Sequence, residues 1–240
     1  MPEGRTRSGP NLAYSVVVGV TSCRRGWLAA SAKLSGSTFA PEEPRVYETL
    51  VEMLDERPPF SVVALDAPIG YLDQARAGGR TCDRQARALL GARRGSAIHS
   101  APCRTILESG IAKNVAPLDA VSRQLLPRFR EVHDQMAPYL QRRVYEVRPE
   151  MSFYQLNGDA PLRWSKRLER GKEERRKLIE TRMPGIERVL EAEIPGVGVG
   201  RLLDAASILW TARRIAAKAA TRLPDDPEWD SEGLRMEIIC

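Results

Sequence analysis

Two short, uninterrupted runs of apolar residues constrain the fold of this 240-residue chain more than any other feature. The first, at residues 14–20, reads YSVVVGV, and the second, at residues 62–65, reads VVAL. A strand with one face in water alternates apolar and polar side chains, whereas a strand covered on both faces is apolar throughout. We therefore expect both runs to be strands inside a sheet that is covered on both sides.

The segments around these runs predict helices and further strands. Residues 26–34 read as a second strand, reached across a five-residue turn, and residues 36–44 hold room for a short third strand. Apolar residues then recur at helical spacing at Val46, Leu50, Met53 and Leu54. An order of strand, strand, short strand, helix and strand is typical of a mixed α/β sheet.

The second half of the chain alternates helical and extended patterns. Helices are expected over 82–91, over 118–142, through the charged stretch 165–183 and after the glycine-rich loop at 195–200. Residues 143–149 return to strand character, and residues 233–239 predict a terminal edge strand. We interpret residues 1–12 as a disordered tail and 13–240 as a single domain.

Composition limits the classes of function. The chain carries 37 Lys and Arg against 31 Asp and Glu, a net charge of +6, and most of its cations are arginines. Such a surface favours phosphates or nucleic acid, although a coding bias toward arginine explains it equally well. No apolar run is long enough to span a membrane. The four widely spaced cysteines indicate a reducing compartment, which predicts a cytoplasmic protein.

Four carboxylates stand at places where enzymes hold metal ions. Asp66 follows the buried strand at 62–65, Glu146 and Glu150 belong to the later strand and its end, and Asp204 begins the last long helix. Acids that converge at strand ends can bind Mg²⁺ or Mn²⁺, which prefer oxygen ligands. Each acid also has a simpler interpretation, as a turn cap, a helix N-terminal residue or an ion-pair partner.

A resemblance to a known family adds to this interpretation. The segments GVTSCRRGWLAA, ALDAPIG, RTCDRQARALLGARRGSAIHSAPCR, YEVRPEMSF and LLDAASILWTA occur in this order. Together they resemble the DUF429 family of predicted RNase H-like nucleases, from about residue 14 to residue 217. The resemblance implies an RNase H-like mixed β-sheet flanked by helices, with additional helical segments. It also implies metal-dependent phosphodiester cleavage in which Asp66, Glu146, Glu150 and Asp204 form the catalytic site and Asp66 and Asp204 hold the metal.

The sequence departs from the family pattern at the expected site. The first hairpin of the family reads G-V-D-G-C, and here Thr21 and Ser22 replace the Asp and the Gly. The later block expects E-V-H-P-E, and Arg148 replaces the His, while Leu203 stands where an acid often precedes Asp204. Since both Thr21 and Arg148 lower the negative charge that attracts divalent cations, the site is expected to be partly degenerate.

Several basic residues are candidates for phosphate binding. Arginine can grip a phosphate with two hydrogen bonds, and Lys166 matches a family-like position. The alternative is ordinary surface charge. The candidates are Arg80, Arg87, Arg94, Arg104, Arg148 and Lys166. Zinc or thiol chemistry at Cys82, His99 and Cys103 is disfavoured, because no second pair of ligands accompanies them.

Three hypotheses follow from these observations. The first is a metal-dependent RNase H-like nuclease or phosphodiesterase. The second is a non-catalytic descendant that binds nucleic acid or a protein partner through the same cleft. The third is an enzyme that acts on a small phosphorylated metabolite, which rests on analogy between folds alone. The sequence leaves open the choice of DNA or RNA and the oligomeric state.

Overall fold

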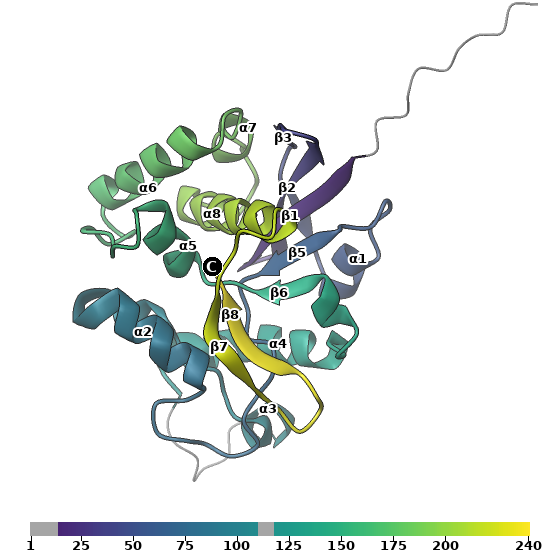
Figure 1. The fold of residues 1–240 in the computed structure, drawn as a ribbon, viewed down its shortest axis with the longest axis vertical. Coiled ribbons are helices and arrows are strands. Elements are labelled where there is room, and N and C mark those ends of the chain that lie inside the picture. The colour runs from purple at the N-terminus through teal and green to yellow at the C-terminus, as the bar shows by residue number, and fades with distance from the viewer. Residues whose placement is uncertain (1–13, 110–117) are drawn as a thin grey trace, which may run out of the picture.

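A computed structural model describes residues 14–109 and 118–240 of the chain. The predicted tail at residues 1–12 lies outside the described residues. A mixed sheet with strand order β3-β2-β1-β5-β6 forms the centre of the fold (Figure 1). Strand β4 pairs with the beginning of β2. Its strands are β1 (Ser15–Cys23), β2 (Gly26–Ser35), β3 (Thr38–Pro41), β4 (Arg45–Tyr47), β5 (Val62–Leu65) and β6 (Val144–Glu146). The expected mixed β-sheet flanked by helices is therefore confirmed.

The two apolar runs are inner strands, as their pattern predicts. Strand β1 pairs antiparallel with β2 and parallel with β5, and β5 pairs parallel with β6. Side chains of β1 alternate between two cores: Val16, Val18 and Val20 face one, whereas Val17 faces the other. Because both faces are covered, apolar residues fill every position of β5.

The first hairpin is tighter than predicted. Cys23 pairs with Gly26, so the turn consists of Arg24 and Arg25 rather than five residues. Gly26 has a φ of +141°, and a Cβ atom there would lie 2.0 Å from the carbonyl oxygen of Tyr47. Glycine therefore allows both the turn and the close approach of β4.

Helices cover both faces of the sheet (Figure 1). On one face α8 packs across β1, β2 and β5, with α5, α6 and α7 around it, and on the other lie α1 and α4. The helices are α1 (Leu50–Leu54), α2 (Thr81–Arg94), α3 (Arg104–Ser109), α4 (Ala120–Gln135), α5 (Pro149–Leu156), α6 (Glu169–Arg182), α7 (Glu187–Leu190) and α8 (Val199–Ala216), with short 3₁₀ turns at Gly95–Ala97 and Leu140–Arg142.

Helix α8 approaches β1 more closely than any side chain allows. A Cβ atom on Gly19 would lie 2.2 Å from the backbone nitrogen of Leu209 and 2.6 Å from the carbonyl oxygen of Ala205. The predicted apolar stripe of this helix, which includes Leu202, Ala206, Leu209 and Ala212, is buried. Backbone contact at Gly19 thus fixes the distance of α8 from the sheet.

Three predicted elements differ from the structure. Val46 lies in β4, so the first helix is limited to Leu50–Leu54. The long helix ends at Gln135, because Pro138 follows, and a 3₁₀ turn carries Leu140. The predicted strand at 143–149 stops at Glu146, and Pro149 opens helix α5 instead.

A second, two-stranded sheet lies beside α2. The predicted terminal strand, β8 (Arg235–Ile239), pairs antiparallel with β7 (Arg222–Trp229). The sequence of β7, RLPDDPEW, contains two prolines and three acids, which are poor strand formers and hide this strand from pattern analysis. Among the described residues, no helix is long and apolar enough to cross a membrane.

Candidate functional site

The parallel strands β1, β5 and β6 end at one edge of the sheet, and the predicted acids gather there. Thr21 lies near the end of β1, Asp66 directly follows β5, and Glu146 ends β6. The backbone nitrogen of Asp66 donates a hydrogen bond of 2.8 Å to the carbonyl oxygen of Val20, which ties β5 to β1 at this point. Helix α8 brings Asp204 to the same edge, in its second turn rather than its first.

Asp66 has one neutral and one charged neighbour. The Thr21 hydroxyl donates a hydrogen bond of 2.9 Å to Asp66 Oδ2, and Arg148 Nη1 lies 3.8 Å from Asp66 Oδ1. Burial raises the pKa of Asp66 and the charge of Asp204 adds to this, so that the opposing effect of Arg148 is outweighed. The Asp66 side chain keeps 18% of its surface exposed. It is the most accessible of the four predicted carboxylates.

Asp204 is buried and pairs with a lysine. Lys166 Nζ lies 2.7 Å from Asp204 Oδ2, and Arg201 Nη1 lies 3.9 Å from the same oxygen. The other oxygen, Asp204 Oδ1, is buried and has no hydrogen-bond partner among the described residues. Burial lowers the pKa of Lys166, but attraction to Asp204 and Asp66 outweighs this and the net shift is upward. Lys166 therefore remains an ammonium, with 40% of its side chain exposed.

We refer to Thr21, Asp66, Arg148, Lys166 and Asp204 as the open cluster. Its members come from β1, the end of β5, the start of α5, the loop before α6 and α8. The charges of Lys166 and Asp204 both shift the pKa of Asp66, and the charge of Asp66 raises that of Lys166, so these charges lie within electrostatic reach of one another. That Asp66 and Asp204 act together in one catalytic site stays a prediction.

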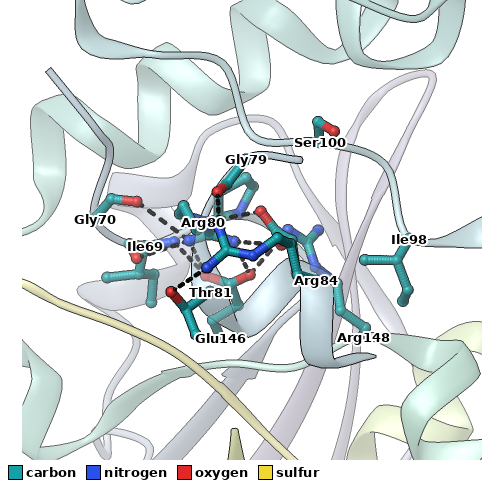
Figure 2. A network of polar contacts seen from close by, with 12 residues as sticks. Ile69, Gly70, Gly79, Arg80, Thr81, Arg84, Ile98, Ser100, Glu146 and Arg148 are labelled. Atoms are coloured by element: carbon teal, nitrogen blue, oxygen red, sulfur yellow. Dashed lines mark hydrogen bonds and ion pairs between the residues drawn. The ribbon is translucent and has the colours of Figure 1, made fainter. Parts of the chain in front are cut away.

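Glu146 belongs to a second group, which we call the closed network: Arg80, Asp83 and Glu146. The Arg80 guanidinium binds both Glu146 oxygens at 2.6 and 2.8 Å and both Asp83 oxygens at 2.9 and 3.0 Å. It also donates to the carbonyl oxygens of Ile69 and Gly70, as Figure 2 shows. All three members are almost completely buried. Every strong partner of Glu146 thus comes from the protein itself.

Arg148 connects the two groups. Its Nη2 lies 2.9 Å from Glu146 Oε1 (Figure 2), and its Nη1 lies 3.8 Å from Asp66 Oδ1. The Ile69 backbone nitrogen also donates to Glu146 Oε2 at 2.7 Å. With these contacts Glu146 is fully engaged, so it has no oxygen free to bind a ligand. Its proposed catalytic role stays a prediction that the geometry does not favour.

Glu150 is likewise engaged by a buried cation. Both of its oxygens accept hydrogen bonds from Arg175 Nη2, at 2.7 and 2.9 Å. Arg175 is fully buried and also donates to the carbonyl oxygens of Trp164 and Gly171. A Cβ atom at Gly171 would lie 2.0 Å from the Ser165 carbonyl oxygen. This pair therefore holds the Lys166 loop against α6.

The remaining predicted phosphate ligands make internal contacts. Arg87 donates to the carbonyl oxygens of Ile98 and Gly78 and to Ser100 Oγ. Arg94 donates to the carbonyl oxygens of Leu162 and Arg163. Arg104 lies within 3.1 Å of both Asp73 and Asp230 and also pairs with Glu232. Of the predicted basic residues, only Arg148 and Lys166 belong to the open cluster.

Sequence reasoning missed Asp83 and Arg175. Asp83 follows Arg80 by three positions at the start of α2, a spacing that places both on one side of the turn. Burial raises the pKa of Asp83, but Arg80 outweighs it and the net shift is downward. Arg175 lies in the charged stretch 165–183, which the sequence predicts as a helix, and its charge gives no sign of burial. The available signal was Gly171, since a glycine inside a charged helix indicates a close backbone contact.

The donor set does not fit a resident divalent cation. Among residues 14–109 and 118–240, no group of three or more His, Cys, Asp or Glu side chains is arranged to hold a metal ion. Asp66 and Asp204 would bring two negative charges, and Arg148 and Lys166 already set two positive charges beside them. Cations so close oppose a third cation. Metal binding by Asp66 and Asp204 stays a prediction.

Comparison with known proteins places the chain in a family. No curated protein and no solved structure matches it. Residues 19–229 match the family described as "Protein of unknown function (DUF429)". This match includes β1 from Gly19 onward, the open cluster, the closed network and all of β7. Since it spans most of the sequence, the chain belongs to the DUF429 family.

Proposed function

We propose that this chain is a non-catalytic nucleic-acid-binding protein of the RNase H-like type, which acts in the cytoplasm and binds phosphates beside the open cluster. The observation that carries the proposal is a set of exposed arginines, which we call the basic rim. Within the described structure none of them forms an ion pair with a carboxylate. The rim consists of Arg24, Arg25, Arg163, Arg167 and Arg170.

The basic rim flanks the open cluster on two sides. Arg24 and Arg25 form the hairpin turn that follows Thr21 by a few residues. Arg163 and Arg167 precede and follow Lys166 in the loop that reaches Asp204. Exposed, unpaired arginines attract the phosphate backbone and release its counterions, which is the main source of affinity for nucleic acid irrespective of sequence.

An aromatic residue orders part of the rim. The guanidinium carbon of Arg170 lies 3.2 Å from the ring centroid of Trp164, and that of Arg163 lies 4.7 Å from it. Stacking on a tryptophan holds a guanidinium by its planar face and leaves its N–H groups directed outward. The two arginines are therefore preorganised for contacts with phosphates.

Metal-dependent hydrolysis is the second candidate function. It is favoured by the proximity of Asp66 to Asp204 and by the unpartnered Asp204 Oδ1. We place it second because Arg148 and Lys166 compensate these acids. An enzyme for small phosphorylated metabolites lacks comparable support. Two cavities, one beside Leu34 and Arg213 and one beside Lys33 and Tyr47, include no residue of the open cluster.

The test is binding of labelled single-stranded and double-stranded DNA and RNA, measured by fluorescence anisotropy from 50 to 300 mM salt. We expect affinity to fall steeply with salt. The variant R163Q/R167Q/R170Q should bind more weakly. Its plot of log affinity against log salt should also be less steep, by about one for each phosphate that an arginine no longer neutralises. The matched control R57Q/R93Q/R182Q removes three exposed arginines elsewhere and should keep the wild-type slope.

The outcomes separate the candidates. Equal losses in both triple variants would show that only net charge matters and would contradict the proposed site. Cleavage of any substrate with Mg²⁺ or Mn²⁺, analysed on denaturing gels, would favour the nuclease if it disappears in D66N/D204N. That double variant also controls for contaminating nucleases.

A further inference from the structure

The acids of the open cluster pose an electrostatic problem that this chain solves with its own side chains. Two carboxylates, Asp66 and Asp204, belong to one site of low exposure, and the charge of Asp204 adds to burial in raising the pKa of Asp66. Sites of this kind ordinarily hold a bound cation between the acids. Here the side chains that face the acids already carry positive charge.

Arg148 is held in a position to compensate Asp66. It directly precedes α5 and lies just beyond the end of β6, and it is only 7% exposed. Its contact with Glu146 Oε1 at 2.9 Å anchors one nitrogen, and the other points to Asp66 Oδ1 at 3.8 Å. Its Nε and Nη2 have no hydrogen-bond partner among the described residues, so the contact of Nη2 with Glu146 is an ion pair. The guanidinium therefore gains little from this location except its attraction to the acids.

Lys166 and Thr21 complete the compensation. The Lys166 ammonium contacts Asp204 Oδ2 at 2.7 Å. Thr21, fully buried, supplies a neutral hydroxyl that donates to Asp66 Oδ2 at 2.9 Å. A carboxylate at position 21 would instead lie against Asp66 and add a third negative charge. The open cluster thus sets two internal cations against its two acids, and one of these cations, Arg148, is shared with Glu146.

We propose that Arg148 and Lys166 take the electrostatic place of a divalent metal ion in this chain, so that the cluster binds no metal and is kept assembled by its own guanidinium and ammonium groups. Position 21 and position 148 act together. The neutral Thr21 avoids a negative charge that one guanidinium would not balance, and Arg148 supplies the cation. This inference does not depend on whether the chain binds nucleic acid.

The test reverses both features in the full-length protein. The variant T21D/R148Q changes the local charge by two units, and it exchanges side chains of similar volume at the fully buried position 21. We expect Mn²⁺ to bind this variant at one saturable site, measured by isothermal titration calorimetry and by the electron paramagnetic resonance signal of free Mn²⁺. About tenfold tighter binding per unit charge predicts a gain on the order of 100-fold over the wild type.

The control variant T38D/R93Q makes the same change of charge at exposed positions away from the cluster. It should bind Mn²⁺ as weakly as the wild type. Tight, saturable Mn²⁺ binding by the wild type that is lost in D66N/D204N would overturn the proposal. A folded T21D/R148Q protein with wild-type affinity for Mn²⁺ would also overturn it.

Thermal unfolding keeps the proposal testable where the double variant is too unstable to titrate. The single variant R148Q leaves Asp66 without its cation but keeps the contacts of Glu146 with Arg80. Millimolar Mn²⁺ should therefore raise the Tm of R148Q and leave that of the wild type unchanged, because a ligand stabilises only the folded state that binds it. Equal shifts in both proteins would contradict the inference.

Discussion

The closed network and the open cluster lie at the same edge of the sheet and use the same chemistry, yet they differ in how completely their charges are satisfied. In the closed network, Arg80 binds Glu146 and Asp83 through four hydrogen bonds and is only 1% exposed. In the open cluster, Asp204 Oδ1 and Arg148 Nε lack partners among the described residues, and Lys166 is 40% exposed. The closed network has no polar atom left for a ligand, whereas the open cluster has atoms that could still accept a partner.

This difference assigns the two groups to different tasks. A buried charge costs several kcal/mol unless its partners are arranged around it, so a saturated network maintains a structure and is unable to accept a ligand. A buried polar atom without a partner, in contrast, can still accept a ligand that supplies one. We therefore expect Glu146, predicted as catalytic, to maintain the structure, whereas Asp66 and Asp204 stay the candidates for a functional role.

We expect the largest loss in the free energy of unfolding when the cation of the closed network is removed. In Arg80→Met, Glu146 and Asp83 stay buried and Asp83 loses the cation that binds both of its oxygens. We expect a loss of about 3–5 kcal/mol in the free energy of unfolding, the range for one partner removed from a buried pair. Urea unfolding followed by circular dichroism measures the loss.

Lys166→Met is the matched variant in the open cluster. Because its ammonium is partly exposed, water can replace it at Asp204, and we expect a loss of only about 1 kcal/mol. Equal losses in the two methionine variants would mean that the open cluster supports the fold as much as the closed network does. The assignment of separate tasks would then fail.

The next largest effect is expected where α8 touches β1. In Gly19→Ala the new methyl group meets the backbone of Leu209 and Ala205, so α8 has to move away from the sheet. Overpacking of this kind costs about 1–3 kcal/mol. Since α8 carries Asp204, the open cluster should loosen, whereas the closed network contains no residue of this helix.

Hydrogen exchange distinguishes the two regions in this variant. Amides of α8 should exchange faster in Gly19→Ala, and amides of α2, which carries Asp83, should change less. Gly200→Ala provides the control, because nothing lies within 4 Å of its Cβ position and alanine favours the helix. Its stability should equal or slightly exceed that of the wild type. Uniformly faster exchange in Gly19→Ala would show that both regions open together.

The sequence predicted the strands that carry the site better than it predicted the ion-pair partners of the acids. Continuous apolar runs identify β1 and β5 because burial on both faces leaves a local pattern, and parallel strands then bring Thr21 and Asp66 to one edge. The partners of each acid are not local. Arg175 lies 25 residues from Glu150, and Lys166 lies 38 residues from Asp204. No periodicity records such pairings.

Burial determines which of the predicted arginines can contact a ligand, and the sequence does not show burial. Arg80 and Arg104 both carry a charge that suits phosphate, and only the structure shows that their N–H groups are directed to carboxylates of the chain. Strand β7 was missed because tertiary pairing with β8 overrides its poor local preference. Arg148, in contrast, was identified from its position next to Pro149-Glu150 and does contact the acids.

The smallest loss in the free energy of unfolding is expected when an ion pair on the surface is removed. Arg76 and Glu228 lie 2.8 Å apart, and their side chains are 41% and 35% exposed. The hydrogen bonds from Arg76 lower the pKa of Glu228 to about 2, from an ordinary value of 4.5. A carboxylate with a lowered pKa stabilises the fold fully above its unfolded pKa and progressively less as the pH falls toward its folded pKa.

Glu228→Gln should therefore cost most at neutral pH, and this cost should shrink from about pH 4.5 toward pH 2. After allowance for solvent screening of a half-exposed pair, we expect a difference of about 1 kcal/mol at pH 7. Urea unfolding of both proteins at pH 7 and pH 3 measures the change. Glu193→Gln, at an exposed position, should show a difference near zero at both values. If the cost of Glu228→Gln were instead constant with pH, its cause would be poorer packing rather than charge. The surface pair would then not stabilise the fold through its charges, as the closed network does.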